Sequence, residues 1–422
     1  MNLLHWFTNP NIPPSVNKRN FLNVQIDAIG IGLAGAAAPF LPVFLTRLSA
    51  TALQISLLTA MPAITGLILS IPVGNFLQSR KQIVPWFSAA RLMVVLSYAL
   101  TGLAPFILPR DQVITAVLAI WAIATIPQTM VAIGFSVVMN AVAGPNSRYE
   151  LMTRRWSILG FTTSVTVIIA GQILDHLGFP FNYQLVFMGL SVGGLISYYF
   201  SSHIKLPDFD VNLAGKGKPF LEIIKTYATL VRGEKAFISF TAKRFIFLTG
   251  TAMAAPIFPL YYVRQVHASD AWIGVISTAQ SAILIIGYFF WSRQSRRRGN
   301  KMVLFWTTLG LSLHPILVAL TGQVWLIAVF AGLSGIFQAG LDLVFFDELM
   351  QTFPAEYSAT FVSLAQSLQY MSSIIAPLVG SILANQIGLG GALIVSASIR
   401  MIGCLSFAIS YLRTRNLAPA EE

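Results

Sequence analysis

Long apolar runs alternate with short polar segments along almost the whole chain. About 20 apolar residues, at a rise of about 1.5 Å each, are enough for a helix to cross a bilayer. Backbone groups in lipid must satisfy their own hydrogen bonds, so such runs form closed bundles of helices. The pattern predicts an all-α membrane protein with twelve spans, at 21–45, 53–77, 83–107, 112–140, 156–177, 183–203, 238–263, 271–292, 301–321, 324–349, 359–386 and 391–412.

The first and seventh runs share one plan at an offset of 217 residues. The matched pairs are Asp27 with Arg244, Pro39 with Pro256, Pro42 with Pro259, and Arg47 with Arg264. At offsets of 209 to 210, Gln128, Pro145 and Gly171 match Gln338, Pro354 and Gly380. These matches predict two duplicated, pseudo-symmetric bundles of six helices, related as parallel repeats.

The change in composition between the sixes predicts five segments. These are an N-terminal segment 1–20, a bundle 21–203, a polar linker 204–237, a second bundle 238–412 and a tail 413–422. After Pro219, apolar residues at helical spacing predict a short helix, which either lies on the inner membrane surface or packs against the bundle.

Charge distribution predicts how the spans are oriented. Hydrophobic residues make up 55% of the chain and charged residues 10%, and mean hydropathy is +0.72. With both termini on one side, 22 of the 27 Lys and Arg residues fall on that side. The positive-inside rule then predicts cytoplasmic termini and a cytoplasmic linker, in the cell (inner or plasma) membrane. The net charge of +12 comes mainly from basic residues on the predicted cytoplasmic side, so we expect no nucleic-acid partner.

The sequence offers nothing for catalysis. It has one cysteine, Cys404, within an apolar run, and no His and Cys cluster at metal-ligand spacing. It also lacks the Gly-x-x-x-x-Gly-Lys loop of ATP-driven proteins. We therefore expect no enzyme activity, no cofactor and no metal site.

Two basic loops carry a resemblance to a known family. The segment 74–81 reads GNFLQSRK and the segment 292–301 reads SRQSRRRGNK. With twelve spans in two duplicated sixes, the chain resembles the major facilitator superfamily of secondary transporters, whose loops at these places read Gly-x-x-x-Asp-Arg-x-Gly-Arg. Gln78 and Arg296 stand where the family has its aspartate, so the network that locks the cytoplasmic gate is either different here or weaker. The gate-loop candidates are Gly74, Arg80, Lys81, Arg296, Arg297 and Gly299; ordinary basic cytoplasmic loops are the other interpretation.

The resemblance implies transport by alternating access, with spans 1, 4, 7 and 10 around a central cavity. The candidates for the substrate or proton pathway are Asp27, Gln128, Arg244, Gln338 and Asp342. Polar side chains in membrane spans need partners, and residues four apart share a helix face, as Gln338 and Asp342 do.

Our hypothesis for the site is a cluster of Asp27, Arg244 and Asp342, in which one acid carries a proton when it loses its cation. The alternatives are fixed salt bridges that brace the gate, and direct contact with substrate. Arg91 is expected either to extend toward the cytoplasm or to reach Asp27. Arg400 is expected to pair with polar groups of a neighbouring helix.

Two further residues receive structural interpretations. His314, before Pro315, is expected to be a hydrogen-bonded residue at a helix kink. Asp270 is expected to cap the N-terminus of span 8.

The sequence therefore predicts a secondary transporter of a small molecule, with proton coupling as one mechanism and a lean toward export of amphiphilic organic compounds. Span 5 reads IAGQ at 169–172 and lacks the proline of the family's exporter signature. One alternative is uptake of a polar solute such as a sugar or an organic anion. Another is a transporter-shaped protein that acts in membrane assembly or sensing. Substrate identity, coupling ion and oligomeric state stay open.

Overall fold

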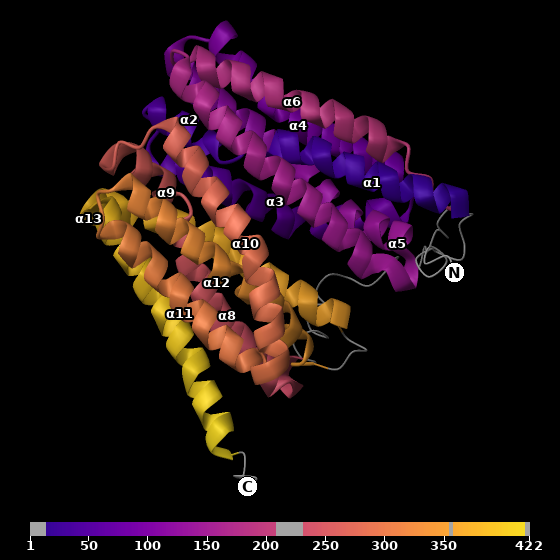
Figure 1. Cartoon of the computed structure of the whole chain (residues 1–422), viewed down its shortest axis with the longest axis vertical. Helices are drawn as coiled ribbons and strands as arrows, with labels where there is room; N and C mark the ends of the chain where they lie inside the picture. The colour runs from indigo at the N-terminus through magenta and orange to yellow at the C-terminus, as the bar shows by residue number, and fades with distance from the viewer. Residues whose placement is uncertain (1–13, 208–230, 354–357, 418–422) are drawn as a thin grey trace. The chain divides into compact units, whose positions relative to one another are not determined.

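The computed structural model describes residues 14–207, 231–353 and 358–417, and these residues form helices and short connections. The first part contains α1 (Pro14–Gly35), α2 (Phe40–Arg47), α3 (Ala52–Gln78), α4 (Val84–Ile107), α5 (Arg110–His176) and α6 (Phe181–Ser202). The second part contains α8 (Lys235–Ala254), α9 (Ile257–Leu260), the π-helical η3 (Tyr261–Gln265), α10 (Asp270–Arg298), α11 (Asn300–Ala319), α12 (Val324–Met350) and α13 (Ser358–Leu417). Figure 1 shows these elements along the chain.

The number of membrane spans agrees with the sequence prediction. Eleven stretches of the described residues are long and apolar enough to cross a membrane. The last of them, Leu364–Ile409, runs across Gly388, which has a φ of 80° and divides α13 into two helices. A positive φ suits glycine, which has no Cβ. Spans 11 and 12 are thus joined in one stretch, and the prediction of an all-α membrane protein is confirmed.

Spans 1 and 7 are both interrupted near their matched prolines. The chain leaves α1 after Gly35 and re-enters a helix at Phe40, directly after Pro39. In the second part α8 ends at Ala254, and α9 begins after Pro256. Proline has no N–H to donate and its ring clashes with the preceding turn, so it breaks a helix. The matched prolines therefore produce the same interruption in each repeat.

The helices form two compact units. Unit 1 holds α1, α2, the part of α3 from Ile64, α4, α5, α6 and the segment Ser269–Gly274 at the start of α10. Unit 2 holds Ser49–Ala63 and the described residues of the second part up to Ala268 and from Val275 on. The start of the second span of each repeat thus belongs to the unit of the other repeat. The boundaries 21–203 and 238–412 stay a prediction from the sequence repeat.

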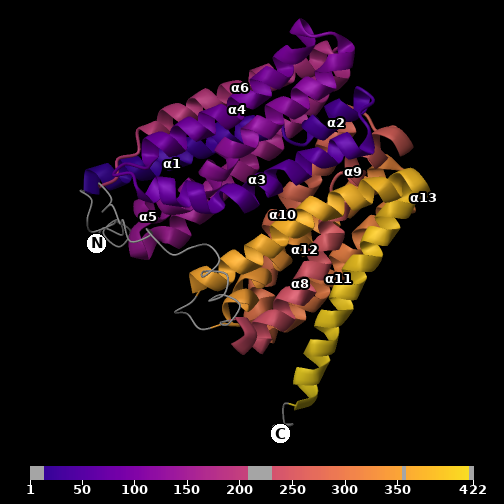
Figure 2. The same ribbon diagram turned by 180° about the vertical axis from the view of Figure 1, so that it is seen from behind.

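In unit 1, α1 packs between α5 and α6, and α4 packs against the same two helices, as Figures 1 and 2 show. Gly30 and Gly193 set the closest approach of α1 to α6. A Cβ on Gly30 would lie 2.5 Å from the Gly193 carbonyl oxygen, and a Cβ on Gly193 would lie 2.6 Å from that of Gly30. Any larger residue at either position would separate the two helices.

In unit 2, α13 packs against both α8 and α11, and α11 also packs against α12. A cluster rich in phenylalanine fills one end of this unit, including Phe240, Phe345 and Phe407. Gly250 of α8 repeats the close contact of unit 1, because a Cβ there would lie 2.7 Å from the Ser396 carbonyl oxygen. The two repeats therefore share a packing device as well as a sequence pattern. The helix predicted after Pro219 falls mostly on residues 219–230, outside the described residues.

Candidate functional site

Asp27 lies at the centre of a buried charge cluster in unit 1. Its Oδ1 accepts hydrogen bonds from Arg91 of α4 and from the Ser197 hydroxyl of α6, the latter at 2.6 Å. Its Oδ2 lies 3.6 Å from an amino nitrogen of Arg155 in α5. Asp27 has an exposed fraction of 0%, Arg91 of 4% and Arg155 of 2%. Four helices of one bundle thus meet around this carboxylate.

The cluster contains two guanidinium groups and one carboxylate. Burying charge is costly unless it is paired, and here ring faces supply part of the compensation. Arg91 lies 4.3 Å from the ring centre of Phe87, and Arg155 lies 4.6 Å from that of Phe135. The Nε atoms of both arginines and Oδ2 of Asp27 have no hydrogen-bond partner among the described residues. We will call Asp27, Arg91, Arg155 and Ser197 the unit 1 charge cluster.

Within unit 1 the structure gives Asp27 other partners than the Arg244 and Asp342 of our hypothesis. Asp27 is fully enclosed by its own bundle and paired with Arg91, which is one of the two outcomes expected for that arginine. Arg155 and Ser197 were missed, because Arg155 had been counted only as a cytoplasmic charge at the start of span 5. Their partner lies 128 and 170 residues away in sequence, beyond any local pattern.

Arg244 occupies the matching position in unit 2 and has neutral partners. It donates a hydrogen bond of 2.9 Å to the Gln369 side-chain oxygen in α13, and its guanidinium lies 5.5 Å from the ring centre of Phe345. The Arg244 Nε is buried and has no hydrogen-bond partner within the part of the chain that the structure describes. Among the described residues no ion pair joins Arg244 to Asp342. Gln369 therefore takes the place that the hypothesis gave to an acid.

Asp342 of α12 is exposed and accepts hydrogen bonds from two neutral groups. The Gln338 amide donates to Oδ1 at 2.7 Å, as expected for residues four apart, and the Tyr288 hydroxyl of α10 donates to Oδ2 at 3.2 Å. No cation is paired with Asp342 within the described residues. Tyr288 was not predicted; a hydroxyl inside an apolar span is the signal that could have found it.

Gln128 of α5, the partner of Gln338 in the repeat, is half-buried and takes part in none of these contacts. Thr125, one turn earlier on the same helix, belongs to a separate polar group, in which its hydroxyl lies 2.6 Å from that of Thr65. The structure therefore leaves Gln128 as a sequence prediction.

The gate-loop candidates are mostly exposed cations. Arg80 lies over the rings of Phe76 and Trp86, at 4.5 and 5.1 Å from their centres. Lys81, Arg296 and Arg297 are exposed, and no ion pair joins them to another described residue. Gly74 is half-buried in α3, with open space where a Cβ would stand. Gly299 has a φ of 79° directly before α11 and so serves the turn itself.

The opposite end of unit 1 contains a second ion pair, in which the carboxylate is buried and the arginine is half-buried. Arg47 approaches Oδ1 of Asp270 at 2.9 Å, and the Tyr183 hydroxyl donates to the same oxygen at 2.6 Å. Asp270 is therefore not the helix cap that the sequence suggested. The Ser269 hydroxyl accepts the Trp272 N–H instead, at 3.4 Å, and frees the carboxylate for Arg47.

The matched arginine of the other repeat makes the corresponding contact in unit 2. Arg264 donates to the carbonyl oxygen of Ala50, at the start of the second span of the first repeat. Arg47 and Arg264, which match one another in the two repeats, thus each contact the start of the second span of the other repeat.

Arg400 and His314 lie in the core of unit 2. Arg400 is 5% exposed and donates to the Leu311 carbonyl oxygen at 3.0 Å, which confirms the expected pairing with a neighbouring helix. His314 lies against Phe258, with ring centres 5.1 Å apart, but its Nε2 has no hydrogen-bond partner. For this nitrogen the expected hydrogen bond is absent.

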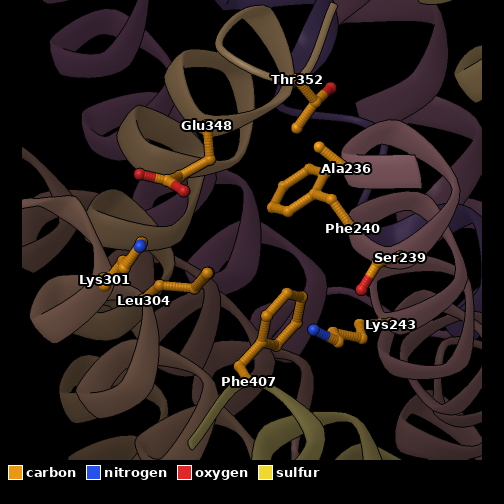
Figure 3. A pocket seen from close by; sticks show the side chains of 9 residues that line it. All are labelled: Ala236, Ser239, Phe240, Lys243, Lys301, Leu304, Glu348, Thr352 and Phe407. Carbon is orange, nitrogen blue, oxygen red and sulfur yellow. The ribbon is translucent and has the colours of Figure 1, made fainter. Parts of the chain in front are cut away.

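One pocket of about 190 Å³ opens at the end of unit 2 where α8 and α11 begin and α12 ends. Figure 3 shows the rings of Phe240 and Phe407 facing one another across it, with the amine of Lys301 on the side of the Glu348 carboxylate. None of the pathway candidates lines it. Among the described residues no group of three His, Cys, Asp or Glu side chains could hold a metal ion.

Comparison with known proteins finds a family match for the second half of the chain. Residues 241–422 match the family model described as Major Facilitator Superfamily. The curated protein "Multidrug resistance protein MdtG" of Citrobacter koseri is 26% identical over 179 residues, which cover 40% of this chain and 43% of that protein. The protein of the same name in Proteus mirabilis is 24% identical over 183 residues, covering 42% and 44%. The chain thus matches less than half the length of these relatives.

Solved structures match over nearly the whole chain. A POT family transporter in complex with a thioalcohol-conjugated peptide has a TM-score of 0.71 at 12% identity, covering 98% of this chain and 99% of its own. A bacterial homologue of the iron transporter ferroportin in its inward-facing state has a TM-score of 0.69 at 15% identity, covering 94% and 98%. At such identities these likenesses show the fold.

Proposed function

We propose that the chain, whose residues 241–422 match the major facilitator superfamily, is a secondary active transporter that exports amphiphilic organic compounds by alternating access. The twelve predicted spans, the repeat and the family match of residues 241–422 support the transport class. The name of the curated relatives, a multidrug resistance protein, supports the lean toward export.

One observation carries the mechanism: the carboxylate of Asp342 is exposed within a membrane span and has no cation paired with it among the described residues. An ionisable side chain in a span that is not enclosed by protein faces a water-filled path rather than lipid. Neutral donors from Gln338 and Tyr288 orient the carboxylate without cancelling its charge. Asp342 is thus suited to bind either a proton or the positive end of a substrate.

Proton coupling follows if a proton and a cationic substrate compete for the carboxylate of Asp342. A proton on Asp342 removes the charge that a cationic substrate needs, so the proton and substrate would occupy the site in turn. A ligand shifts a conformational equilibrium only by its differential affinity for the two states. Exchange of the two at one carboxylate would couple export of substrate to entry of protons.

A second candidate is uptake of a polar, anionic solute, which Arg244 favours. Its guanidinium is held by a neutral amide and a ring, and its Nε has no hydrogen-bond partner. A carboxylate or phosphate on a substrate would complete these hydrogen bonds. The two candidates differ in the charge of the substrate and in the residue that recognises it.

Orientation is proposed from charge placement. The positive-inside rule places the termini and the linker in the cytoplasm of a cell whose inner or plasma membrane holds the protein. The Asp27 cluster then lies toward the cytoplasmic ends of its helices, and the Arg47–Asp270 pair lies toward the opposite side.

The test measures accumulation of cationic, neutral and anionic compounds in cells that express the wild type, Asp342→Asn or Asp342→Glu at equal membrane abundance. We expect the wild type to lower accumulation of cationic amphiphiles, Asp342→Asn to abolish the change, and Asp342→Glu to retain part of it. Asp111→Asn, at an exposed position in the first turn of α5, is the matched control.

Two outcomes would redirect the proposal. Anionic solutes whose level rises in an Arg244-dependent way would establish uptake and overturn export. A flat profile across all three charge classes, with normal protein abundance, would favour the assembly or sensing role. For a compound that is moved, an imposed pH gradient across proteoliposomes decides coupling, because a proton-coupled exporter responds to it and an uncoupled one does not.

A further inference from the structure

The pocket at the end of unit 2 is lined by one face of α8. Ala236, Ser239, Phe240 and Lys243 stand at positions i, i+3, i+4 and i+7, which lie on the same side of a helix. Lys301 and Leu304 of α11, Glu348 and Thr352 at the end of α12, and Phe407 of α13 complete the wall. The pocket is therefore built by four helices of one compact unit.

Its floor is apolar and its rim is charged. Leu304, Phe240 and Phe407 are 4%, 8% and 5% exposed. Lys301 is exposed at the rim, while Lys243 and Glu348 are half-buried. Two ammonium groups and one carboxylate give the lining a net charge of +1. A pocket with aromatic walls beneath lysines suits an anion that carries an apolar body.

The position of the pocket strengthens the preference for an anion. The first turns of both α8 and α11 contribute to it, and the N-terminal end of a helix carries a partial positive charge. Both helices belong to stretches that are long and apolar enough to cross a membrane, and the pocket lies at their N-terminal ends. Ile238 of α8 and Trp306 of α11 are 44% and 48% exposed nearby in sequence, as expected for surfaces that meet lipid.

We propose that this pocket binds a phosphate ester, with the phosphate between Lys243 and Lys301 and the apolar part against Phe240 and Phe407. Phosphate is an anion that both lysine ammonium groups and helix N-termini bind. Glu348 lies beside Lys301 and competes with the phosphate for its charge. The site is separate from Asp342 and from the proposed transport pathway. Its test therefore does not depend on whether the transport proposal is right.

Two sources supply this chemistry: a phospholipid headgroup or a soluble phosphate ester. Titration calorimetry on the full chain in uncharged detergent would use dioctanoyl phosphatidylglycerol for the first and phenyl phosphate for the second. Binding of the lipid alone identifies a headgroup site, and binding of both identifies a site for the phosphate itself. Binding of neither overturns the proposal.

Variants decide whether the pocket is the site. We expect Lys243→Gln and Lys301→Gln each to weaken binding about tenfold, the loss of one charge-assisted hydrogen bond. Lys301→Arg should retain binding, and Lys235→Gln, an exposed cation of α8 outside the lining, should leave it unchanged. Equal affinity in all variants would overturn the assignment.

Glu348→Gln gives a test of opposite sign. Removing this carboxylate frees Lys301 and should tighten binding about threefold or more, because an ion pair near the surface has a modest energy. A merely structural role for Glu348 would weaken binding or leave it unchanged. Unliganded thermal midpoints of all variants confirm that each protein is folded before it is compared.

Discussion

The two repeats hold matched charges, Asp27 and Arg244, in different ways. Asp27 is fully enclosed and joined to two arginines and a serine from three other helices. Arg244 is half-buried and meets one neutral amide and a ring. Asp27 of span 1 contacts Arg155 of span 5, and Arg244 of span 7 contacts Gln369 of span 11. These are corresponding spans of the two repeats. The duplicated backbone has thus kept the contact while its chemistry diverged.

This difference separates stability from function. An ion network inside one bundle ties its helices together and leaves little freedom for a ligand. A half-buried cation with a neutral partner costs little to release and remains available. We therefore propose that the unit 1 charge cluster maintains the integrity of its bundle, and that either Asp342 or Arg244 recognises the ligand, according to its charge.

The largest expected effect is that of Asp27→Asn. It leaves Arg91 and Arg155 buried without a counter-charge, and removing one partner from a buried ion pair costs about 3–5 kcal/mol. The free energy of unfolding in detergent, from a denaturant titration, measures the loss. Asp111→Asn is the exposed control. An unchanged midpoint in Asp27→Asn would show that the cluster does not stabilise the bundle.

A smaller effect is expected for Arg155→Gln. Its amino nitrogen is 3.6 Å from Asp27, and its removal leaves one arginine facing one carboxylate. The loss of the contact and of stacking on Phe135 costs about 1–2 kcal/mol. The double variant Asp27→Asn with Arg155→Gln should be more stable than Asp27→Asn alone, since one uncompensated charge is gone. Strict additivity in the same titration would mean that the two residues are not coupled.

The smallest effect on stability is expected for Arg244→Gln. Its partner Gln369 can hydrogen-bond to another amide, and removing a half-buried cation also removes its desolvation cost, so the change should stay within about 1 kcal/mol. Any transport of anionic solutes should fall at the same time, whereas Arg244→Lys should retain part of it. A loss of stability comparable to that of Asp27→Asn would erase the contrast between the repeats.

Sequence patterns over a few residues predicted the structural features that depend on interactions within the same short stretch of chain. The interruption of spans 1 and 7 follows from Pro39 and Pro256, because a proline donates no backbone hydrogen bond and its ring clashes with the preceding turn. The hydrogen bond between Gln338 and Asp342 follows from their spacing of four residues on one helix. Even so, a local motif can mislead: Asp270 looked like a cap, but Ser269 takes that role because Arg47 and Tyr183 hold the carboxylate.

Partners that are distant in sequence could not be predicted in this way. Arg91 was expected to reach Asp27 as one of two outcomes, but Arg155 and Ser197 were not foreseen. The sequence of an apolar span does not show which of its faces packs against which neighbouring helix. A charged residue inside the span therefore indicates that a partner is required, but it does not identify that partner. The pocket proposed to bind a phosphate ester could not be predicted for the same reason, because its lining residues come from four helices that are distant in sequence.

The sequence by itself determined the membrane class, the spans, the duplication and the positions of Asp27 and Arg244 within their spans, because hydrophobicity, proline and spacing act over a few turns of chain. Only the tertiary structure decided how each charge is paired. Packing brought α1, α4, α5 and α6 around Asp27 and left Asp342 without a cation paired to it within the described residues. Charge compensation depends on distances between helices, and those distances are set when small residues such as Gly30 and Gly193 let the helices meet.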